Sequence, residues 1–122
     1  MMNGIKLALI GLALGSAASM AGECPAPGLP TLPDGATATM EQMLAGQKSV
    51  KEYQAANSGY RACLDPQVSA AEVAAAGDKP SEAAVATLKK LNDDYNGSVS
   101  KEEALAVKFN AALRDYKTAH PG

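Results

Sequence analysis

The four residues GDKP at positions 77–80 separate two helix-forming stretches and so decide the fold of this chain. Gly77 can end one helix, Asp78 can cap the next, and a proline such as Pro80 is well tolerated in the first turn of a helix. The flanking stretches, residues 39–76 and 80–117, have equal length and are rich in alanine, leucine, glutamate and lysine, which favour helix. The sequence therefore predicts an all-α fold, an antiparallel, coiled-coil-like two-helix hairpin over residues 39–122.

Signals for helix starts and for a kink lie within this frame. Thr39 followed by Gln42 is a capping-box pattern, which predicts that the first helix begins just after Thr39. Asp78 or Ser81 can cap the second helix. Pro66 predicts a kink in the first helix, because proline has no N–H and crowds the preceding turn.

Apolar and small side chains recur in steps of three and four along both stretches, which places them on one face of each helix. On the first helix this face, the seam, consists of Met43, Gly46, Val50, Tyr53, Asn57, Tyr60 and Leu64. On the second helix it consists of Leu88, Leu91, Tyr95, Val99, Glu102, Ala106, Phe109, Leu113 and Tyr116. Facing residues of an antiparallel hairpin have a nearly constant sum of residue numbers, here about 155. This register sets the small Gly46 opposite the large Phe109, and Tyr53 opposite Glu102, where we expect a hydrogen bond.

Residues 22–38 precede the first helix and are predicted to form an extended, proline-rich arm. Within the string CPAPGLPTLPDG, residues 24–35, prolines recur every three residues, which is the period of a polyproline II helix. The PDG sequence at 33–35 predicts a turn, with the glycine free to take a positive φ. The chain should therefore reverse there and lay the arm along the first helix.

The chain has two cysteines, Cys24 and Cys63, and their spacing predicts a disulfide. An extended arm from Cys24 to Gly35 covers about 34 Å, and a helix from Thr39 to Cys63 covers about 36 Å. Because these lengths match, an arm folded back along the helix brings the cysteines level and staples the arm to the first helix. A reactive redox pair is the alternative, but such pairs are usually close in sequence, as in CxxC.

The N-terminal residues 1–21 have the pattern of a signal peptide. Lys6 is followed by an apolar run and then by small residues that end at Ala21, so the mature chain should begin at Gly22. The apolar run is too short to cross a bilayer, and we expect no membrane insertion after the signal is removed. The sequence thus predicts a periplasmic or secreted protein, in a compartment that permits disulfides.

Composition narrows the possible partners. Loss of Lys6 with the signal leaves ten basic and thirteen acidic side chains, a formal charge of −3, which argues against nucleic acid as a partner. With no tryptophan and one phenylalanine, a mature chain of about one hundred residues that folds as a helix pair buries only a thin core. We therefore expect a protein partner or self-association, for example into a four-helix bundle.

Residues 92–103, NDDYNGSVSKEE, are similar to an EF-hand calcium loop, with Gly97 at the sixth position. The oxygen ligands would be Asn92, Asp94, Asn96, Ser100 and Glu103. Against this reading, Tyr95 continues the helical seam through the same stretch. We therefore expect a helix with a weak point at Gly97 and no bound cofactor, and weak calcium binding is the alternative.

The sequence gives little support to an enzyme. His120 is the only histidine and lies two residues from the C-terminus. Adjacent carboxylates such as Asp93 and Asp94 point apart on a helix and form a solvated face. We expect no catalytic residues, and predict a helical interaction or structural protein.

Several strings give the chain a resemblance to a known group of proteins. They are CPAPGLPTLPDGATAT, then Met43, Gln47, Val50, Tyr53, Tyr60, Cys63-Leu64, Tyr95-Asn96, Val99, Phe109-Asn110 and Tyr116. With these residues the chain resembles a family of small exported, periplasmic, two-cysteine helical proteins of Gram-negative bacteria, which has no assigned function. The resemblance implies an exported helical protein, in which the YNxxV stretch that begins at Tyr95 is helix.

Overall fold

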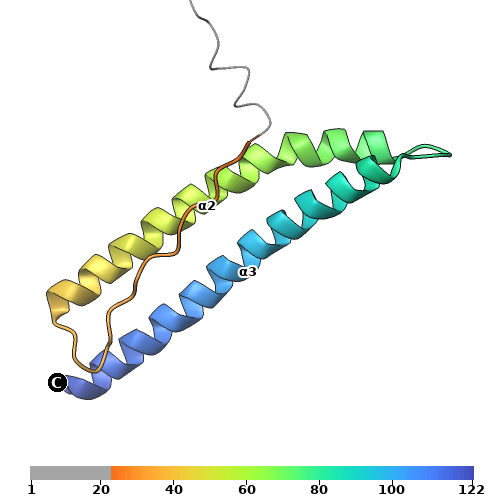
Figure 1. Ribbon diagram of the computed structural model, residues 1–122. Coiled ribbons are helices and arrows are strands. Elements are labelled where there is room, and N and C mark those ends of the chain that lie inside the picture. The colour runs from red at the N-terminus through yellow and green to blue at the C-terminus, as the bar shows by residue number, and fades with distance from the viewer. Residues whose placement is uncertain (1–22) are drawn as a thin grey trace, which may run out of the picture.

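The computed structural model describes residues 23–122, and the predicted signal peptide, residues 1–21, lies outside them. The described part is all-helical, with no strand. Its two helices, α2 (Met40–Ala75) and α3 (Glu82–Ala119), pack against each other as a helical hairpin (Figure 1). Both helices begin and end within two residues of the predicted bounds.

The predicted caps start both helices. The Thr39 hydroxyl accepts a hydrogen bond from the Gln42 backbone N–H at 3.1 Å, and the Gln42 side-chain oxygen accepts one from the Thr39 N–H at 2.9 Å. This is the predicted capping box. Of the two candidates for α3, Ser81 is the cap, and its hydroxyl accepts from the Ala84 N–H at 3.1 Å.

Helix α2 continues through Pro66 as one helix. In Figure 1 its green C-terminal part, which contains Pro66, runs in a different direction from its yellow N-terminal part. A proline removes one backbone hydrogen bond and crowds the preceding turn, and both effects bend a helix at that point without ending it.

The predicted register holds at two separate levels of the hairpin. A Cβ atom placed on Gly46 would lie 3.4 Å from Phe109 Cε2, so the small and the large side chain do face each other. Further along, the Asn57 side chain hydrogen-bonds to Ser98. Both pairs of residue numbers sum to 155, as predicted.

The arm, residues 23–38, is held to the hairpin by a disulfide at one end and a turn at the other. Cys24 and Cys63 form the predicted disulfide, with their Cα atoms 5.8 Å apart. At the other end, the Ala38 N–H donates to the Asp34 carbonyl at 2.8 Å and closes the turn before α2. Between these points the arm runs beside both helices (Figure 1), and its residues line small hollows together with residues of α2 and α3.

Gly35 is needed for a different reason from the one that the sequence suggested. Among the described residues only Gly122 has a positive φ, so the prediction of a positive φ at Gly35 was wrong. A Cβ atom on Gly35 would instead overlap the carbonyl oxygen of Ala112. The turn lies directly on the backbone of α3, and only a residue without a side chain fits there.

The arm also explains why the predicted seam of α3 was only partly right. The buried residues of α3 are Ser98, Leu105, Phe109 and Ala112, and of these only Phe109 belongs to the predicted seam. Leu105 lines a small hollow together with arm residues Leu29 and Leu32. The most buried stripe of α3 is therefore turned toward the arm, because side chains there are covered by both the arm and α2.

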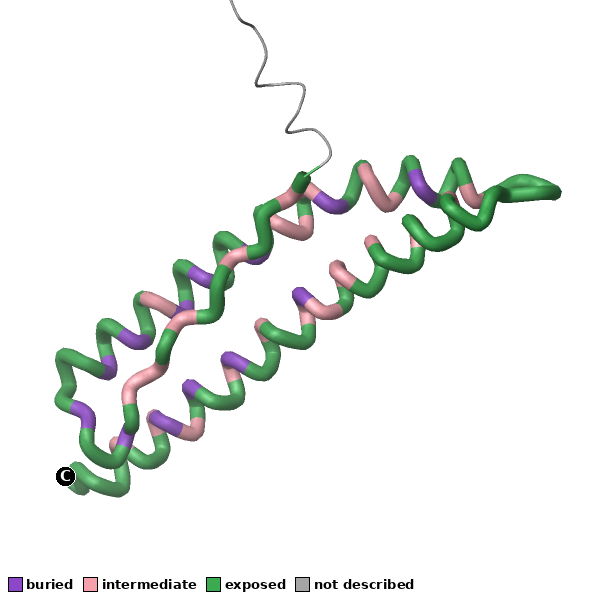
Figure 2. Tube along the Cα trace, viewed as in Figure 1, coloured by how far each residue is buried: buried purple, intermediate pink, exposed green. Residues whose placement is uncertain are grey.

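The arm covers one part of the hairpin and leaves the other part uncovered; we name these parts the covered half and the open half. In the covered half, residues 40–63 of α2 and 92–119 of α3, the arm adds a third layer, and the main core cluster lies there. In the open half, residues 64–75 of α2 and 82–91 of α3, the only buried apolar side chains are Leu64 and Ala71. Figure 2 shows most buried positions, in purple, in the part of the hairpin beside the arm.

Candidate functional site

A buried polar network joins the two helices near the middle of the hairpin. Asn57, 1% exposed, donates from Nδ2 to the Ser98 carbonyl at 2.9 Å and accepts from the Ser98 hydroxyl at 2.8 Å. Arg61 donates to the same hydroxyl at 3.1 Å and lies 3.5 Å from the Glu102 carboxylate. The polar groups of this network are directed at one another, which fixes the register of the two helices.

Glu102 pairs with Arg61 instead of forming the hydrogen bond that was predicted with Tyr53. It still acts on Tyr53 through its charge. Burial is the main cause that raises the pKa of Tyr53, the negative charge of Glu102 adds to this effect, and Arg61 opposes it. Tyr53 therefore stays a neutral phenol in the folded protein at physiological pH.

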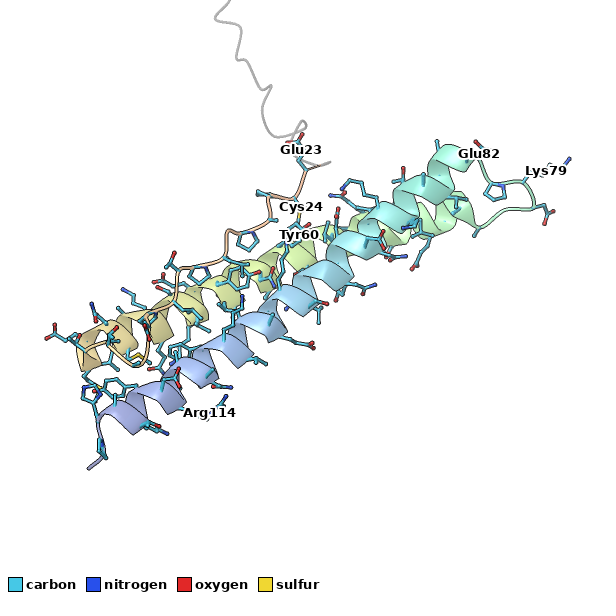
Figure 3. All side chains as sticks on the ribbon, turned by 60° about the horizontal axis from the view of Figure 1, so that its bottom comes forward. Glu23, Cys24, Tyr60, Lys79, Glu82 and Arg114 are labelled. Atoms are coloured by element: carbon cyan, nitrogen blue, oxygen red, sulfur yellow. A yellow bond between two sulfur atoms is a disulfide. The ribbon has the colours of Figure 1, made fainter. Side chains whose placement is uncertain are left out.

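A groove opens where the arm ends and the open half begins, and we name it the junction groove. It has a volume of about 610 Å³. Its walls come from all three segments: Glu23, Cys24 and Pro25 of the arm, Tyr60, Leu64 and Gln67 of α2, and Thr87, Lys90, Leu91 and Asp94 of α3. Figure 3 labels Glu23, Cys24 and Tyr60, which lie together at this end of the arm.

Three charged residues line the junction groove, Glu23 on the arm and the neighbouring Lys90 and Asp94 on α3. Lys90 Nζ lies 2.7 Å from Asp94 Oδ2, and this hydrogen bond, together with the negative charge of Asp94, raises the pKa of Lys90. Gln67 donates from Nε2 to Cys24 Sγ at 3.1 Å. Leu64 and Leu91 supply apolar surface between these groups. The groove is therefore apolar between its walls and polar at its rim, where Lys90 and Asp94 compensate each other and Glu23 adds a negative charge.

The five residues of the calcium alternative do not form a loop in this structure, because α3 is continuous from residue 92 to residue 103. Asp94 pairs with Lys90 on one side of the helix. By helical spacing the other four, Asn92, Asn96, Ser100 and Glu103, share a different, exposed face. Within residues 23–122 there is no cluster of three or more metal-ligating acidic, cysteine or histidine side chains. Calcium binding would require α3 to open around Gly97, and it stays the alternative to the predicted helix.

His120 lies at the end of α3, where its side chain contacts Tyr116. Its ring stacks on Tyr116 with the ring centroids 4.2 Å apart, and its Nδ1 lies 3.1 Å from the Tyr116 carbonyl oxygen. The residue therefore contributes to the end of the helix. Neither the junction groove nor the polar network includes it.

Comparisons with protein-family models, with curated proteins and with solved structures found no match to this chain. Neither helix of the described residues has a stretch that is long and apolar enough to span a membrane. The function therefore has to be inferred from the hairpin itself.

The junction groove was missed at the sequence level, although the sequence contains a signal for it. From the sequence, the arm was placed along the first helix as far as Cys63, and no conclusion was drawn about the helix beyond that point. The disulfide partner of the arm is Cys63, and α2 continues for twelve residues beyond it, to Ala75. An arm tied at Cys63 cannot reach the open half, so the position of the second cysteine already implied an uncovered end.

Proposed function

We propose that this protein is a periplasmic or secreted helical interaction protein without catalytic activity. Its rigid part would be an antiparallel, coiled-coil-like helix pair with an extended, proline-rich arm. We also propose that it belongs with the exported two-cysteine helical proteins that it resembles. The observation that carries the proposal is the unequal cover of the hairpin, with a third layer over one half and none over the other.

Apolar side chains of the open half support a protein partner. Val73 is 78% exposed and Val85 is 48% exposed, and Leu88 and Leu91 are only half-buried. Large apolar side chains are also exposed outside the open half, at Leu29, Met40, Leu44 and Val107, so the feature that sets the open half apart is the lack of a third layer over it. Binding of another chain there would bury this surface and give the open half the third layer that the arm gives the covered half.

The polar network supports a structural role in preference to catalysis. Catalysis by a serine needs a base that accepts its proton and a free position for the substrate. The Ser98 hydroxyl instead donates to Asn57 and accepts from Arg61, and Asn57 is fully enclosed. These groups are used to hold one helix against the other.

The disulfide supports the proposed location. Both cysteines of the chain are joined to each other, which is typical of exported proteins and rare in a reducing cytosol. The signal-peptide pattern of residues 1–21 points the same way.

The proposal is tested by two measurements on the oxidised mature chain. Sedimentation equilibrium over micromolar to millimolar concentration measures self-association. Chemical cross-linking of the tagged protein in intact cells measures association with other proteins. We expect a specific higher-mass species in at least one of them. A chain that is monomeric at every concentration and forms no specific adduct in cells would overturn the proposal.

A further inference from the structure

We infer that the Cys24–Cys63 disulfide is a site of thiol–disulfide exchange with a dithiol protein, which attacks Cys63, displaces Cys24 as the leaving thiolate and so releases the arm from a helix pair that stays folded. This exchange is separate from the proposed interaction function, since it needs no partner on the helices. It follows from the exposure of the two cysteines, from a hydrogen bond to one of the sulfurs and from the way in which the arm is held.

The disulfide lies at the surface, where the arm meets α2 (Figure 3). Cys24 and Cys63 are both half-buried, and Cys24 lines the junction groove. Exchange requires an attacking thiolate to reach one sulfur from the side opposite the other, so its rate depends on access. Because neither cysteine is enclosed by the fold, this bond is open to a thiol from another molecule without prior unfolding.

The two sulfurs differ in their surroundings. Gln67 lies one helical turn after Cys63 on α2, and its Nε2 donates a hydrogen bond to Cys24 Sγ at 3.1 Å. Such a bond becomes stronger when the acceptor gains a negative charge, as the sulfur of a leaving thiolate does. A better stabilised thiolate leaves faster in exchange. Gln67 therefore favours Cys24 as the leaving group and directs the attack to Cys63.

The exchange has two steps. A thiolate of the dithiol protein bonds to Cys63 Sγ, and the electron pair of the broken S–S bond goes to Cys24, which then takes up a proton. The second thiol of the dithiol protein loses its proton and attacks the sulfur of its own cysteine in the mixed disulfide, and Cys63 leaves as a thiolate that is protonated. The dithiol protein ends as a disulfide, and this chain ends with two thiols.

The covalent tie at the N-terminal end of the arm is this disulfide. No backbone–backbone hydrogen bond joins residues 25–33 to either described helix. Leu29 is 54% exposed, so the packing of this stretch on the helices is slight. The other end is fixed independently, by the hydrogen bond from Ala38 to Asp34 and by Gly35 on the backbone of α3. Opening of the disulfide therefore frees the arm up to the turn and leaves the turn in place.

The helix pair has a core that does not depend on the released residues. Ala38 is the one member of the main core cluster that precedes α2, and it belongs to the turn. The hydrogen bonds between Asn57 and Ser98 also join the helices directly. Release of the arm would uncover Leu105, which is 4% exposed and lines a hollow with Leu29 and Leu32. The reduced protein would thus carry an apolar surface on α3 that the oxidised protein covers.

The first test finds the attacked sulfur. The oxidised mature chain is treated briefly with glutathione as a monothiol probe, the reaction is stopped with acid, and mass spectrometry locates the bound glutathione. We expect it on Cys63, with Cys24 as the free thiol. Glutathione mainly on Cys24, or no adduct under conditions in which the chain reacts in urea, would overturn the inference.

The second test measures the part of Gln67 in the exchange. Reduction by dithiothreitol is timed for the parent, for Gln67→Leu and for Gln54→Leu, a matched change at an exposed glutamine of the same helix. We expect Gln67→Leu to react about three to ten times more slowly than the parent, because the leaving thiolate loses a hydrogen bond. Gln54→Leu should react at the parental rate. A rate for Gln67→Leu equal to or above that of Gln54→Leu would overturn the assignment of Cys24 as the leaving group.

The third test follows the arm by amide NMR spectroscopy of the chain after reduction and alkylation of both thiols. We expect the amide signals of Gly28 and Thr31 to move to random-coil positions and sharpen, while those of Val50 and Phe109 keep the dispersion of a folded helix pair. Unchanged signals from Gly28 and Thr31 would show that the arm stays in place, and random-coil signals from all four residues would show that the whole fold is lost. Either result would overturn the release of the arm.

Discussion

The contact between the arm and α2 predicts that alanine is tolerated differently at two glycines of α2. Gly59→Ala should be the more stable variant and Gly46→Ala the less stable one. Gly59 has no neighbouring atom within 4 Å of a new Cβ, so Gly59→Ala should stabilise the protein by about 1 kcal/mol through helix propensity. Gly46→Ala has the same propensity gain, but its Cβ would lie 2.8 Å from Pro33 Cδ and 3.0 Å from Pro33 Cγ. Because overpacking costs about 1–3 kcal/mol, Gly46→Ala should be less stable than Gly59→Ala by that amount.

The assay is urea unfolding of the oxidised variants, followed by circular dichroism. A second background, Pro33→Ala, isolates the cause, because removal of the proline ring leaves room for the new methyl group. We expect the gap between the two alanine variants to shrink in that background, which a double-mutant cycle measures as coupling between positions 33 and 46. Equal stabilities of Gly46→Ala and Gly59→Ala would refute the packing of the arm on α2.

Three further predictions follow from the disulfide, α3 and Tyr53. Removal of the disulfide by paired Cys24→Ser and Cys63→Ser substitutions should lower the free energy of unfolding by about 4 kcal/mol, since the bridge closes a loop across 39 residues of sequence. Gly97→Ala should stabilise the protein by about 1 kcal/mol, because Gly97 lies within α3 with open space around it, and neither variant nor parent should gain stability from millimolar calcium. For Tyr53 the folded pKa is raised above its ordinary value of 10.0, so above that pH the unfolded chain ionises first and the folded state loses stability as pH rises. Tyr53→Phe should therefore lose less stability than the parent above pH 10.0.

Each of these has its own control. Chemical reduction of the parent protein should reproduce the effect of the serine pair, and a loss below about 1 kcal/mol would contradict the stapled arm. A calcium-dependent gain in the parent that Gly97→Ala abolishes would favour the EF-hand alternative. Lys89 and Lys90, whose pKa values are also raised, occur in both the parent and Tyr53→Phe, so they cancel in the comparison. An identical loss in both proteins above pH 10.0 would contradict the burial of Tyr53.

Local and pairwise features of this fold were accessible from the sequence. The Thr39 capping box depends on a few adjacent residues, and the structure contains it. The pairing of Gly46 with Phe109 follows from the position of one turn and the helical period. The disulfide follows from the lengths of the arm and the helix. Each of these depends on one distance along the chain.

Features that depend on three segments at once were not accessible in the same way. The burial of Ser98, Leu105 and Ala112 results from the side on which the arm lies, which helical periodicity does not encode. The close approach that requires Gly35 involves the backbone of α3, far away in sequence. The junction groove likewise exists only because the arm, α2 and α3 meet at one level.

Native-state amide hydrogen exchange of the oxidised protein tests the division into a covered and an open half most directly. We expect amides of the covered half, in residues 43–57 and 98–112, to exchange only through opening close to global unfolding. Amides of the open half, in residues 66–75 and 82–91, should exchange through local opening of much lower free energy. Equal protection in both halves would contradict the account, because it would mean that the open half is stable without a third layer and needs no partner.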